Sequence, residues 1–322
     1  MRALAITGPT ASGKTALSLA VARALDCEII SCDSMQIYKG MDIGTAKATA
    51  EEQSEVKHHL IDLIYPGESY SAENYREDAI IAARDITSRG KIPLFVGGTG
   101  LYIDTVIRGG APISPPSDRA VRDRLMREGE TEEGRDRLYE RLCLVDPDAA
   151  EKTHRNNLRR VVRALEIYEL TGMTKTHFDI LSREVSPDIR VGMITLDFHN
   201  RDLLYSRVDA RVDAMISEGL VDEVRDLYEK GALSQDTTAA QAIGYKELLA
   251  YILGESTLQE AVDEIKLASR RYAKRQLTWF RHESDAVRIF VDTEDGKIKS
   301  IEQLSVETVE IMRNFIISLG EK

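Results

Sequence analysis

The 322-residue chain contains few of the features that mark secreted or membrane proteins. It has three cysteines, Cys27, Cys32 and Cys143, an odd number at spacings that fit no metal-binding motif. No apolar run approaches the roughly 18 residues of a membrane span. The apolar stretch before Gly8 is too short for a signal peptide. We therefore expect reduced thiols, a cytoplasmic location and no association with a membrane.

Positive charge is also scarce, with 43 Lys and Arg against 54 Asp and Glu and a formal net charge of −11. Nucleic-acid-binding proteins usually carry a basic field, so the net charge alone argues against RNA or DNA as a partner. A composition of 43% hydrophobic and 30% charged residues excludes a disordered chain and permits a large core. At roughly 150 residues per domain, the length favours two domains.

Short apolar segments alternate with helical patterns over the first hundred residues, which predicts right-handed βαβ units and a parallel sheet. The predicted fold class is thus α/β. Within the helical patterns, Ser71 is the expected N-cap of one helix and Gly90 its stop. The predicted strands are 2–7, 27–32, 58–64, 92–96, 191–196 and 288–291, and the predicted core helices are 15–25, 70–89, 201–230, 240–253 and 256–281.

A helical block interrupts the α/β pattern. Three of the eight prolines lie within residues 112–116, and only helical signals follow up to about residue 183. Helices are expected to begin at Asp118, at Thr131 and at Asp146-Pro147, and a fourth covers 157–170 before Gly172. We predict a first core segment at 1–115, a helical insertion at 116–188 and a second core segment with C-terminal helices at 189–322.

Residues 8–15 read GPTASGKT and match G-x-x-x-x-G-K-[ST], with a predicted strand before the loop and a helix after it. Gly8 and Gly13 permit a backbone that turns successive N–H groups inward, and the helix N-terminus adds its positive dipole end. Lys14 can reach a distal phosphate, and the Thr15 hydroxyl can ligate Mg²⁺. The pattern predicts a phosphate-binding loop in a P-loop NTPase-like sheet flanked by helices.

A phosphate loop does not name the reaction. Hydrolysis of a nucleoside triphosphate normally needs an aspartate after a second hydrophobic strand to hold Mg²⁺. Asp33, Asp197 and Asp292 all occupy such a position. A kinase or NTPase therefore stays open on the pattern alone.

Two further motifs follow the phosphate loop: DSMQIYKGMDIGTAK at 33–47 and VGGTGLY at 96–102. In this order and spacing the three motifs resemble the tRNA dimethylallyltransferases, also called tRNA isopentenyltransferases or the IPP transferase family. Segments 155–172, 203–224, 242–248 and 273–281 agree, so the resemblance covers roughly residues 3–282. The C-terminal zinc finger of eukaryotic relatives has no counterpart here, which favours the bacterial form.

The resemblance implies transfer of a dimethylallyl group from dimethylallyl diphosphate to N6 of the adenosine 3′ to the anticodon (tRNA position 37). Diphosphate is released and isopentenyladenosine is formed, with Mg²⁺ as cofactor. Asp33 is then the general base, Thr99 a hydrogen-bonding hydroxyl near the reacting atoms, and Arg211 a third catalytic residue. The implied diphosphate-binding residues are Gly8, Thr10, Ala11, Ser12, Gly13, Lys14, Thr15, Arg207 and Arg211.

Each of these side chains also has a purely structural interpretation. Asp33 could be a magnesium ligand or an N-cap, and Thr99 could cap the next helix. Arg207 and Arg211 could form surface salt bridges with the aspartates of the same segment, 203–224. The sequence pattern does not choose between the two interpretations.

RNA could lie on two basic stretches, 152–165 and 265–282, which contain eleven cations and no acid. Solvated surface is the alternative. In the family the insertion clasps the anticodon stem-loop, and a monomer is expected. Gln241 and Lys246 stand where some relatives have Arg. The implied tRNA-binding residues are Asp33, Ser34, Met35, Gln36, Thr99, Arg122, Arg159, Arg160, Val161, Val162, Arg163, Gln241, Gly244, Tyr245 and Lys246.

Three other functions fit part of the sequence. A small-molecule kinase explains the loop but not the acid-free basic helices. An adenylate isopentenyltransferase that uses AMP, ADP or ATP shares the chemistry but does not need the helical insertion. A non-catalytic nucleotide switch explains the fewest of these sequence features.

Overall fold

The computed structural model describes residues 1–107, 115–183, 189–234, 237–283 and 285–319. The chain divides into two compact units, which we call the core unit (Met1–Ile107 with Asp188–Lys322) and the helical unit (Arg108–Pro187). The predicted insertion, 116–188, overlaps the helical unit closely.

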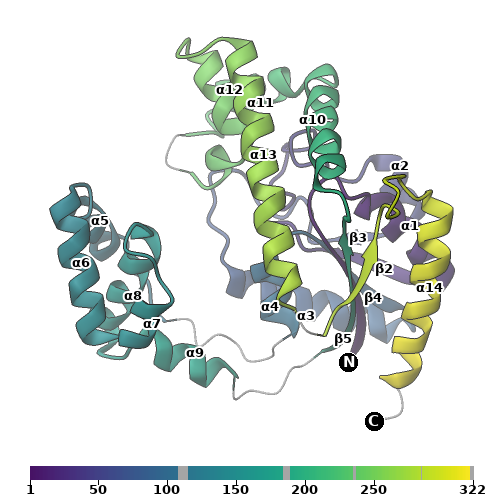
Figure 1. Cartoon of the computed structure of the whole chain (residues 1–322), viewed down its shortest axis with the longest axis horizontal. Helices are drawn as coiled ribbons and strands as arrows, with labels where there is room; N and C mark the ends of the chain where they lie inside the picture. The colour runs from purple at the N-terminus through teal and green to yellow at the C-terminus, as the bar shows by residue number, and fades with distance from the viewer. Residues whose placement is uncertain (108–114, 184–188, 235–236, 284, 320–322) are drawn as a thin grey trace. The chain divides into compact units, whose positions relative to one another are not determined.

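A six-stranded, all-parallel sheet organises the core unit (Figure 1). The strand order is β3-β2-β4-β1-β5-β6, so β1 lies between β4 and β5. All of β1 after Arg2 is buried, because helices cover both faces of the sheet. The strands are β1 (Arg2–Thr7), β2 (Cys27–Ser31), β3 (His58–His59), β4 (Ile92–Gly97), β5 (Arg190–Asp197) and β6 (Val287–Phe290).

Alternate residues of β1 build two different cores. Leu4 and Ile6 pack with α1 (Lys14–Leu25) and α14 (Ile301–Ser318). Ala3 and Ala5 pack on the other face with α3 (Ala72–Ser88) and α4 (Gly100–Ile107). The predicted α/β class, a parallel sheet flanked by helices, is confirmed, and α14 is a helix that the sequence did not predict.

Three other predicted boundaries differ from the structure. β3 is shorter than predicted, because Leu60 and Asp62 adopt positive φ (61° and 54°) and the chain leaves the extended conformation. The predicted helix 201–230 is two helices, because Gly219 has φ 103° and starts a new one. The predicted helix 240–253 begins late, at Tyr245, after a 3₁₀ turn.

The short helix α2 precedes β3 in the chain, and the helices between β5 and β6 pack around a further apolar cluster of the core unit. Their apolar faces enclose Ile37, Tyr38 and Met41 from the chain after β2, so this long connection is packed and not free. Within the described part of the chain, no helix combines the length and the apolar character needed to cross a membrane. The helices are α2 (Ala50–Glu55), α10 (Arg201–Ser217), α11 (Leu220–Glu229), η1 (Ala239–Gln241), α12 (Tyr245–Ile252) and α13 (Leu258–Arg281).

The helical unit contains α5 (Arg119–Glu128), α6 (Glu132–Val145), α7 (Pro147–Glu151), α8 (Leu158–Thr171) and α9 (Lys175–Arg183). Asp118, Thr131 and Asp146 cap α5, α6 and α7 with their side chains, as predicted. Leu125, Leu142 and Leu165 are fully buried in its centre. This unit has its own apolar core.

Candidate active site

The candidate site lies where β1, β2 and β4 end, at the carboxyl edge of the parallel sheet. Open α/β sheets bind ligands at this edge. A cavity of about 330 Å³, which we call the polar cavity, is lined there by Lys14, Thr15, Asp33, Gly98 and Arg211, among others. The predicted phosphate loop and the predicted base therefore face one space.

The phosphate loop has the backbone that its glycines permit. Gly8 (φ 143°) and Gly13 (φ 89°) lie in the region open to glycine, and a Cβ on Gly8 would meet Leu196 at 3.0 Å. Gly13 is the N-cap of α1 and supplies no side-chain cap, so N–H groups at the start of α1 are available to an anion. The Ser12 hydroxyl is buried, and it has no partner among the described residues. A buried donor of this kind is expected to bind a ligand.

Lys14 folds back onto its own loop. Its Nζ donates to the carbonyl oxygens of Gly8 (3.0 Å) and Pro9 (2.6 Å). Burial lowers the pKa of Lys14 to about 7, with the charge of Arg211 acting in the same direction and Asp33 opposing it. A bound diphosphate would favour the charged amine and raise this pKa again.

Arg207 and Arg211, four residues apart on α10, both reach the phosphate loop region. Arg207 Nε donates to the Ala11 carbonyl oxygen at 2.9 Å. Arg211 lines the polar cavity, and burial lowers its pKa. Asp209 and Asp213 pair with Arg270 and Lys266, and Arg211 forms no salt bridge with a carboxylate among the described residues. The interpretation of Arg211 as half of a surface salt bridge is therefore wrong.

Asp33 and Thr99 are neighbours at the ends of β2 and β4. Asp33 Oδ1 accepts from the Met35 N–H at 2.9 Å, which fixes the carboxylate at the start of its turn. Thr99 Oγ1 accepts from the Ser34 N–H at 3.1 Å, and Thr99 N–H donates to the Cys32 carbonyl oxygen at 3.1 Å. The structure thus brings the two predicted catalytic side chains together on adjacent turns.

The other two candidate magnesium aspartates have structural partners. Asp197 is 1% exposed and accepts two hydrogen bonds from the Arg281 guanidinium, at 2.8 and 2.9 Å. Asp292 is fully buried and accepts from the backbone N–H groups of His199 and Asn200. Of the three aspartates, Asp33 lines the polar cavity.

A second cavity of about 310 Å³, which we call the apolar cavity, adjoins the first. Its walls include apolar side chains from α10, α11, α13, the chain after β2 and the turn between η1 and α12: Met35, Val208, Val212, Met215, Leu220, Ile243 and Ile265. Five residues line both cavities: Thr10, Asp33, Thr45, Arg211 and Tyr272. A polar chamber and an apolar chamber therefore meet at Asp33.

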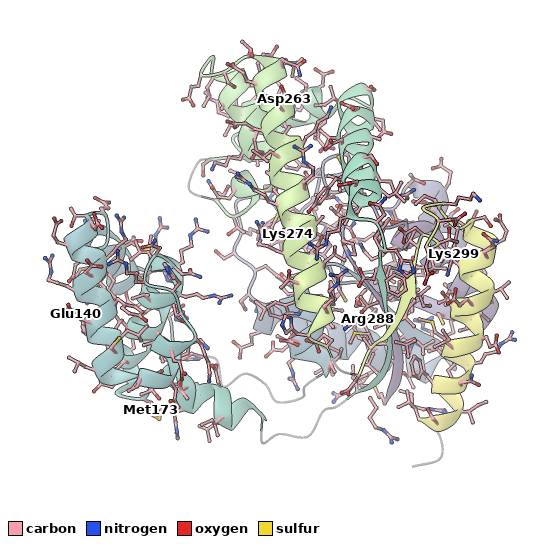
Figure 2. The ribbon with its side chains drawn as sticks, in the orientation of Figure 1. Glu140, Met173, Asp263, Lys274, Arg288 and Lys299 are labelled. Atoms are coloured by element: carbon pink, nitrogen blue, oxygen red, sulfur yellow. The ribbon has the colours of Figure 1, made fainter. Side chains whose placement is uncertain are left out.

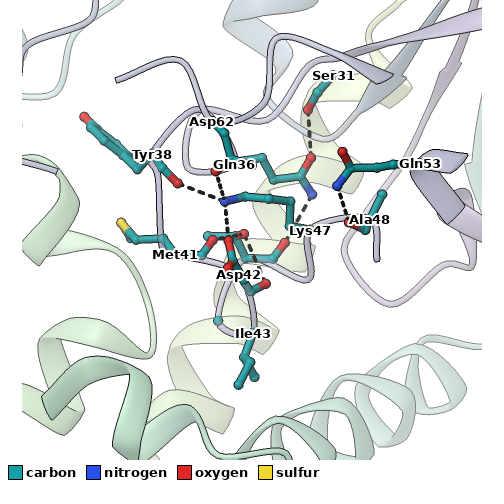
Figure 3. A network of polar contacts seen from close by, with 12 residues as sticks. Ser31, Gln36, Tyr38, Met41, Asp42, Ile43, Lys47, Ala48, Gln53 and Asp62 are labelled. Carbon is teal, nitrogen blue, oxygen red and sulfur yellow. Dashed lines mark hydrogen bonds and ion pairs between the residues drawn. The ribbon is translucent and has the colours of Figure 1, made fainter. Parts of the chain in front are cut away.

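The segment from Gln36 to Lys47 is held in shape by its own polar groups (Figure 3). The Gln36 amide nitrogen donates to the carbonyl oxygens of Thr45 (3.2 Å) and Ala46 (3.3 Å), and its oxygen accepts from the Ser31 hydroxyl. Lys47 Nζ donates to the Tyr38 carbonyl oxygen and pairs with two aspartates of the same network. Gln36, an implied RNA contact, thus uses its amide to shape the cavity wall.

Tyr245, another implied RNA contact, is fully buried. Its hydroxyl donates to Glu223 at 2.6 Å, and the same carboxylate accepts from the N–H groups of Asp42, Ile43 and Gly44. A Cβ on Gly44 would lie 2.5 Å from the Tyr245 ring. The Tyr245 side chain supports the cavity wall from behind, whereas Gln241 and Gly244 line the apolar cavity and Lys246 is exposed.

In the helical unit, the implied RNA contacts separate into three groups. Arg159 and Arg160 are exposed and form no ion pair among the described residues. Arg122 and Arg163 instead pair with the buried Glu166, at 3.1 and 2.9 Å. Val161 and Val162 are each 1% exposed and pack into the core of the unit, so their side chains face away from solvent.

The second basic stretch, 265–282, is only partly available to an anion. Lys266 pairs with Asp213 and Arg270 with Asp209, both at 2.6 Å, and Arg281 with Asp197 at 2.8 Å. Lys274, labelled in Figure 2, is exposed on α13. Half of the six cations are thus neutralised by carboxylates of the core unit.

Two residues of α13 belong to the site although the sequence did not predict them. Tyr272 lines both cavities, and Gln276 lines the polar cavity. Burial raises the pKa of Tyr272 to about 12. Their spacing of four residues places both on one helix face, but the surrounding charges suggested a solvent-exposed helix.

The polar cavity can supply oxygen ligands to a metal ion. Among the described residues, no group of three or more His, Cys, Asp or Glu side chains is arranged to hold a metal. The Thr15 hydroxyl and the Asp33 carboxylate line the same cavity, and Mg²⁺ typically binds one or two protein oxygens together with phosphate oxygens and water. The residues present fit Mg²⁺ brought in with a diphosphate.

Comparison with known proteins points in one direction. A family model described as IPP transferase matches residues 36–283. A tRNA dimethylallyltransferase of Bacillus pumilus is 48% identical over 282 residues, covering 88% of this chain and 87% of that protein. One of Thermoanaerobacter sp. (strain X514) is 45% identical over 288 residues, covering 89% and 91%. The crystal structure of a tRNA isopentenylpyrophosphate transferase from Bacillus halodurans aligns with a TM-score of 0.70 at 41% identity, over 100% of this chain and 99% of that one.

Proposed function

Because the chain belongs to the IPP transferase family, we propose that it transfers a dimethylallyl group from dimethylallyl diphosphate to N6 of the adenosine 3′ to the anticodon in tRNA. The resemblance seen in the motifs is confirmed, and the chain is a tRNA-modifying transferase. The arrangement of the two cavities is the single observation that carries the assignment of residues. They meet at Asp33 and Arg211.

The polar cavity suits the diphosphate of the donor. The loop amides, the buried Ser12 hydroxyl and Lys14 surround an anion there, and Arg207 and Arg211 approach from α10. As the allylic C–O bond breaks, its electron pair leaves with the diphosphate, whose growing negative charge these donors would stabilise once they turn from the loop carbonyls to the bound anion. Mg²⁺, when bound, would neutralise part of this charge, and the Thr15 hydroxyl would hold it.

The apolar cavity suits the base that accepts the group. An adenine leaves its stack in the RNA loop and enters flat and largely uncharged, which matches walls such as Met35, Val212 and Ile243. The N6 lone pair forms the new C–N bond at the junction of the cavities. The proton that N6 loses passes to Asp33, which acts as general base, and Thr99 holds the adjacent turn.

The helical unit would bind the anticodon stem-loop through the exposed face of α8, which presents Arg159 and Arg160. We further propose a monomeric, cytoplasmic enzyme. All three cysteines are free thiols, which suits a reducing compartment.

One assay tests the proposed function. The protein is incubated with Mg²⁺ and radiolabelled dimethylallyl diphosphate, with tRNA, AMP or ATP as acceptor. Label on tRNA is expected. Label on AMP would instead support an adenylate isopentenyltransferase, and consumption of ATP without the prenyl donor would support a kinase.

A further inference from the structure

Gln276 joins two loops that have different tasks in the proposed reaction. It lies on α13 and is 6% exposed. Its amide oxygen accepts from the Thr10 N–H at 2.8 Å, and its amide nitrogen donates to the Gly98 carbonyl oxygen at 3.0 Å. Thr10 N–H can only donate and Gly98 C=O can only accept, so the two contacts fix the orientation of the amide.

The joined loops lie beyond the end of the sheet. The β1–β4 ladder ends at the pair Thr7 and Gly97. Past this pair the chain enters the phosphate loop on one side and the turn that carries Thr99 on the other. Beyond the last backbone pair of β1 and β4, the side chain of Gln276 therefore links the two loops by hydrogen bonds.

α13 approaches the Thr99 turn too closely for side chains on either side of Thr99. A Cβ on Gly98 would lie 2.1 Å from the Gln276 amide nitrogen. A Cβ on Gly100 would lie 2.3 Å from the Trp279 ring nitrogen. The Tyr272 hydroxyl, one turn earlier on the same helix, interacts with Thr99 itself. α13 therefore packs against the turn that carries Thr99, in addition to the hydrogen bonds that Thr99 makes with Cys32 and Ser34.

We propose that Gln276 is a positioning residue that couples the donor-binding loop to Thr99, so that a bound diphosphate orders the turn beside the general base. This rests on the proposed function, in which the phosphate loop holds the donor and Thr99 holds the turn beside Asp33. The Gln276 amide supplies one acceptor and one donor at the right places. A side chain of the same size without both groups breaks the coupling and leaves the packing intact.

Kinetics of Gln276→Met provide the first test. Methionine keeps the length and burial of glutamine but makes neither hydrogen bond. We expect kcat to fall about 10–100-fold, the scale of a misplaced reacting geometry. The KM for dimethylallyl diphosphate and the stoichiometry of donor binding should change little, because the loop amides and Lys14 remain. Thr278→Ala, on the exposed side of α13, is the matched control and should match the wild type.

If Gln276→Met fails to fold, Gln276→Glu replaces it, since the carboxylate still accepts from Thr10 but no longer donates to Gly98. A folded variant whose kcat stays within about threefold of the wild type would overturn the proposal. If the wild-type protein labels no tRNA, the proposed function is refuted. The coupling between the two loops is then tested by hydrogen exchange, described next, which needs no turnover.

Hydrogen exchange measures the coupling directly, with Mg²⁺ and inorganic diphosphate as the probe. In the wild type, diphosphate should slow amide exchange both in residues 8–15 and in residues 98–103. In Gln276→Met, protection should persist in residues 8–15 and disappear from residues 98–103. Equal protection of residues 98–103 in both proteins would contradict the proposal.

Discussion

Asp33 is the residue on which the proposed chemistry depends most. It lines both cavities, and its carboxylate influences the ionisation of Lys14, Arg211 and Tyr272. The competing aspartates, Asp197 and Asp292, are committed to Arg281 and to backbone N–H groups. Of the three aspartates that the sequence left open, Asp33 is therefore the one that lines the cavities, and its role as general base stays a prediction.

Asp33→Asn tests the general-base assignment. Asparagine keeps an oxygen for the Met35 N–H and removes the proton acceptor, so we expect kcat to fall by about 10²–10⁴. Donor binding should persist, because a negative charge is removed beside the diphosphate. Single-turnover rates with saturating tRNA and Mg²⁺ measure the effect. A rate close to that of the wild type would refute the assignment.

At the scale of elements, an ion-pair cluster connects β2 to the edge strand β3 and to Arg89 after α3. Glu28 on β2 is 3% exposed and accepts from the Arg89 guanidinium and from His59 on β3. The hydrogen bonds from Arg89, with His59 assisting, lower the pKa of Glu28 to about 2, although burial alone would raise it. The folded state thus binds the Glu28 proton less tightly than the unfolded state, whose Glu pKa is about 4.3.

Glu28→Gln should lower the free energy of unfolding at pH 7 by about 2–4 kcal/mol, because Arg89 and His59 lose their buried partner. The contribution of Glu28 is fully present above pH 4.3 and is lost as the pH falls toward 2, so the difference between variant and wild type should shrink on acidification. Urea unfolding at pH 7 and at several lower pH values measures it. Glu55→Gln, which breaks an exposed pair with Arg23, is the control and should cost less than about 1 kcal/mol. Equal costs for the two variants would contradict this account.

The arginines of helix α8 lie in two different environments. Arg163 is used on Glu166 inside the helical unit, whereas Arg160 is exposed. If Arg160 neutralises one phosphate, Arg160→Ala should weaken tRNA binding and reduce the magnitude of the salt slope by roughly 0.7–0.9. Filter binding over a range of salt concentrations measures the slope. Lys175→Ala on α9 is the control, and an unchanged slope in Arg160→Ala would return this arginine to ordinary surface.

Local signals in the sequence predicted most helices and strands. They did not predict features that depend on contacts between residues far apart in the chain. The phosphate loop and the caps Ser71, Asp118 and Thr131 depend on residues within one turn, so their pattern is visible in the chain. Which face of α13 meets the site depends on contacts with residues 10 and 98, far away in sequence. Gln276 was therefore missed.

The same limit explains the RNA contacts that the motifs implied. A sequence motif does not distinguish a buried side chain from an exposed neighbour in the same motif. Three of the implied contacts are buried in this way: Tyr245, Val161 and Val162. Their side chains are buried, Tyr245 against Glu223 and the two valines in the helical unit. Val161, Val162 and Leu165 recur at helical spacing in α8, which is the pattern of a packed face.

For the whole molecule, the net charge of −11 is an average over regions with different roles. Of the eleven cations in the two acid-free stretches, five pair with carboxylates: Arg155, Lys266, Arg270 and Arg281 with aspartates, and Arg163 with Glu166. The cations left exposed include Arg159 and Arg160 in one unit and Lys274 in the other. The non-specific affinity of the protein for RNA should therefore be weak, and its recognition of tRNA should depend on the shape of the anticodon loop.

The most direct test of the central claim is the site of modification in the product. tRNA is treated with the protein, Mg²⁺ and dimethylallyl diphosphate, digested to oligonucleotides and examined by mass spectrometry. The account predicts that the oligonucleotide containing the adenosine 3′ to the anticodon becomes heavier by one dimethylallyl group, carried on N6. Asp33→Asn should form this product about 10²–10⁴-fold more slowly. Unmodified tRNA, or a dimethylallyl group at another nucleotide, would contradict it.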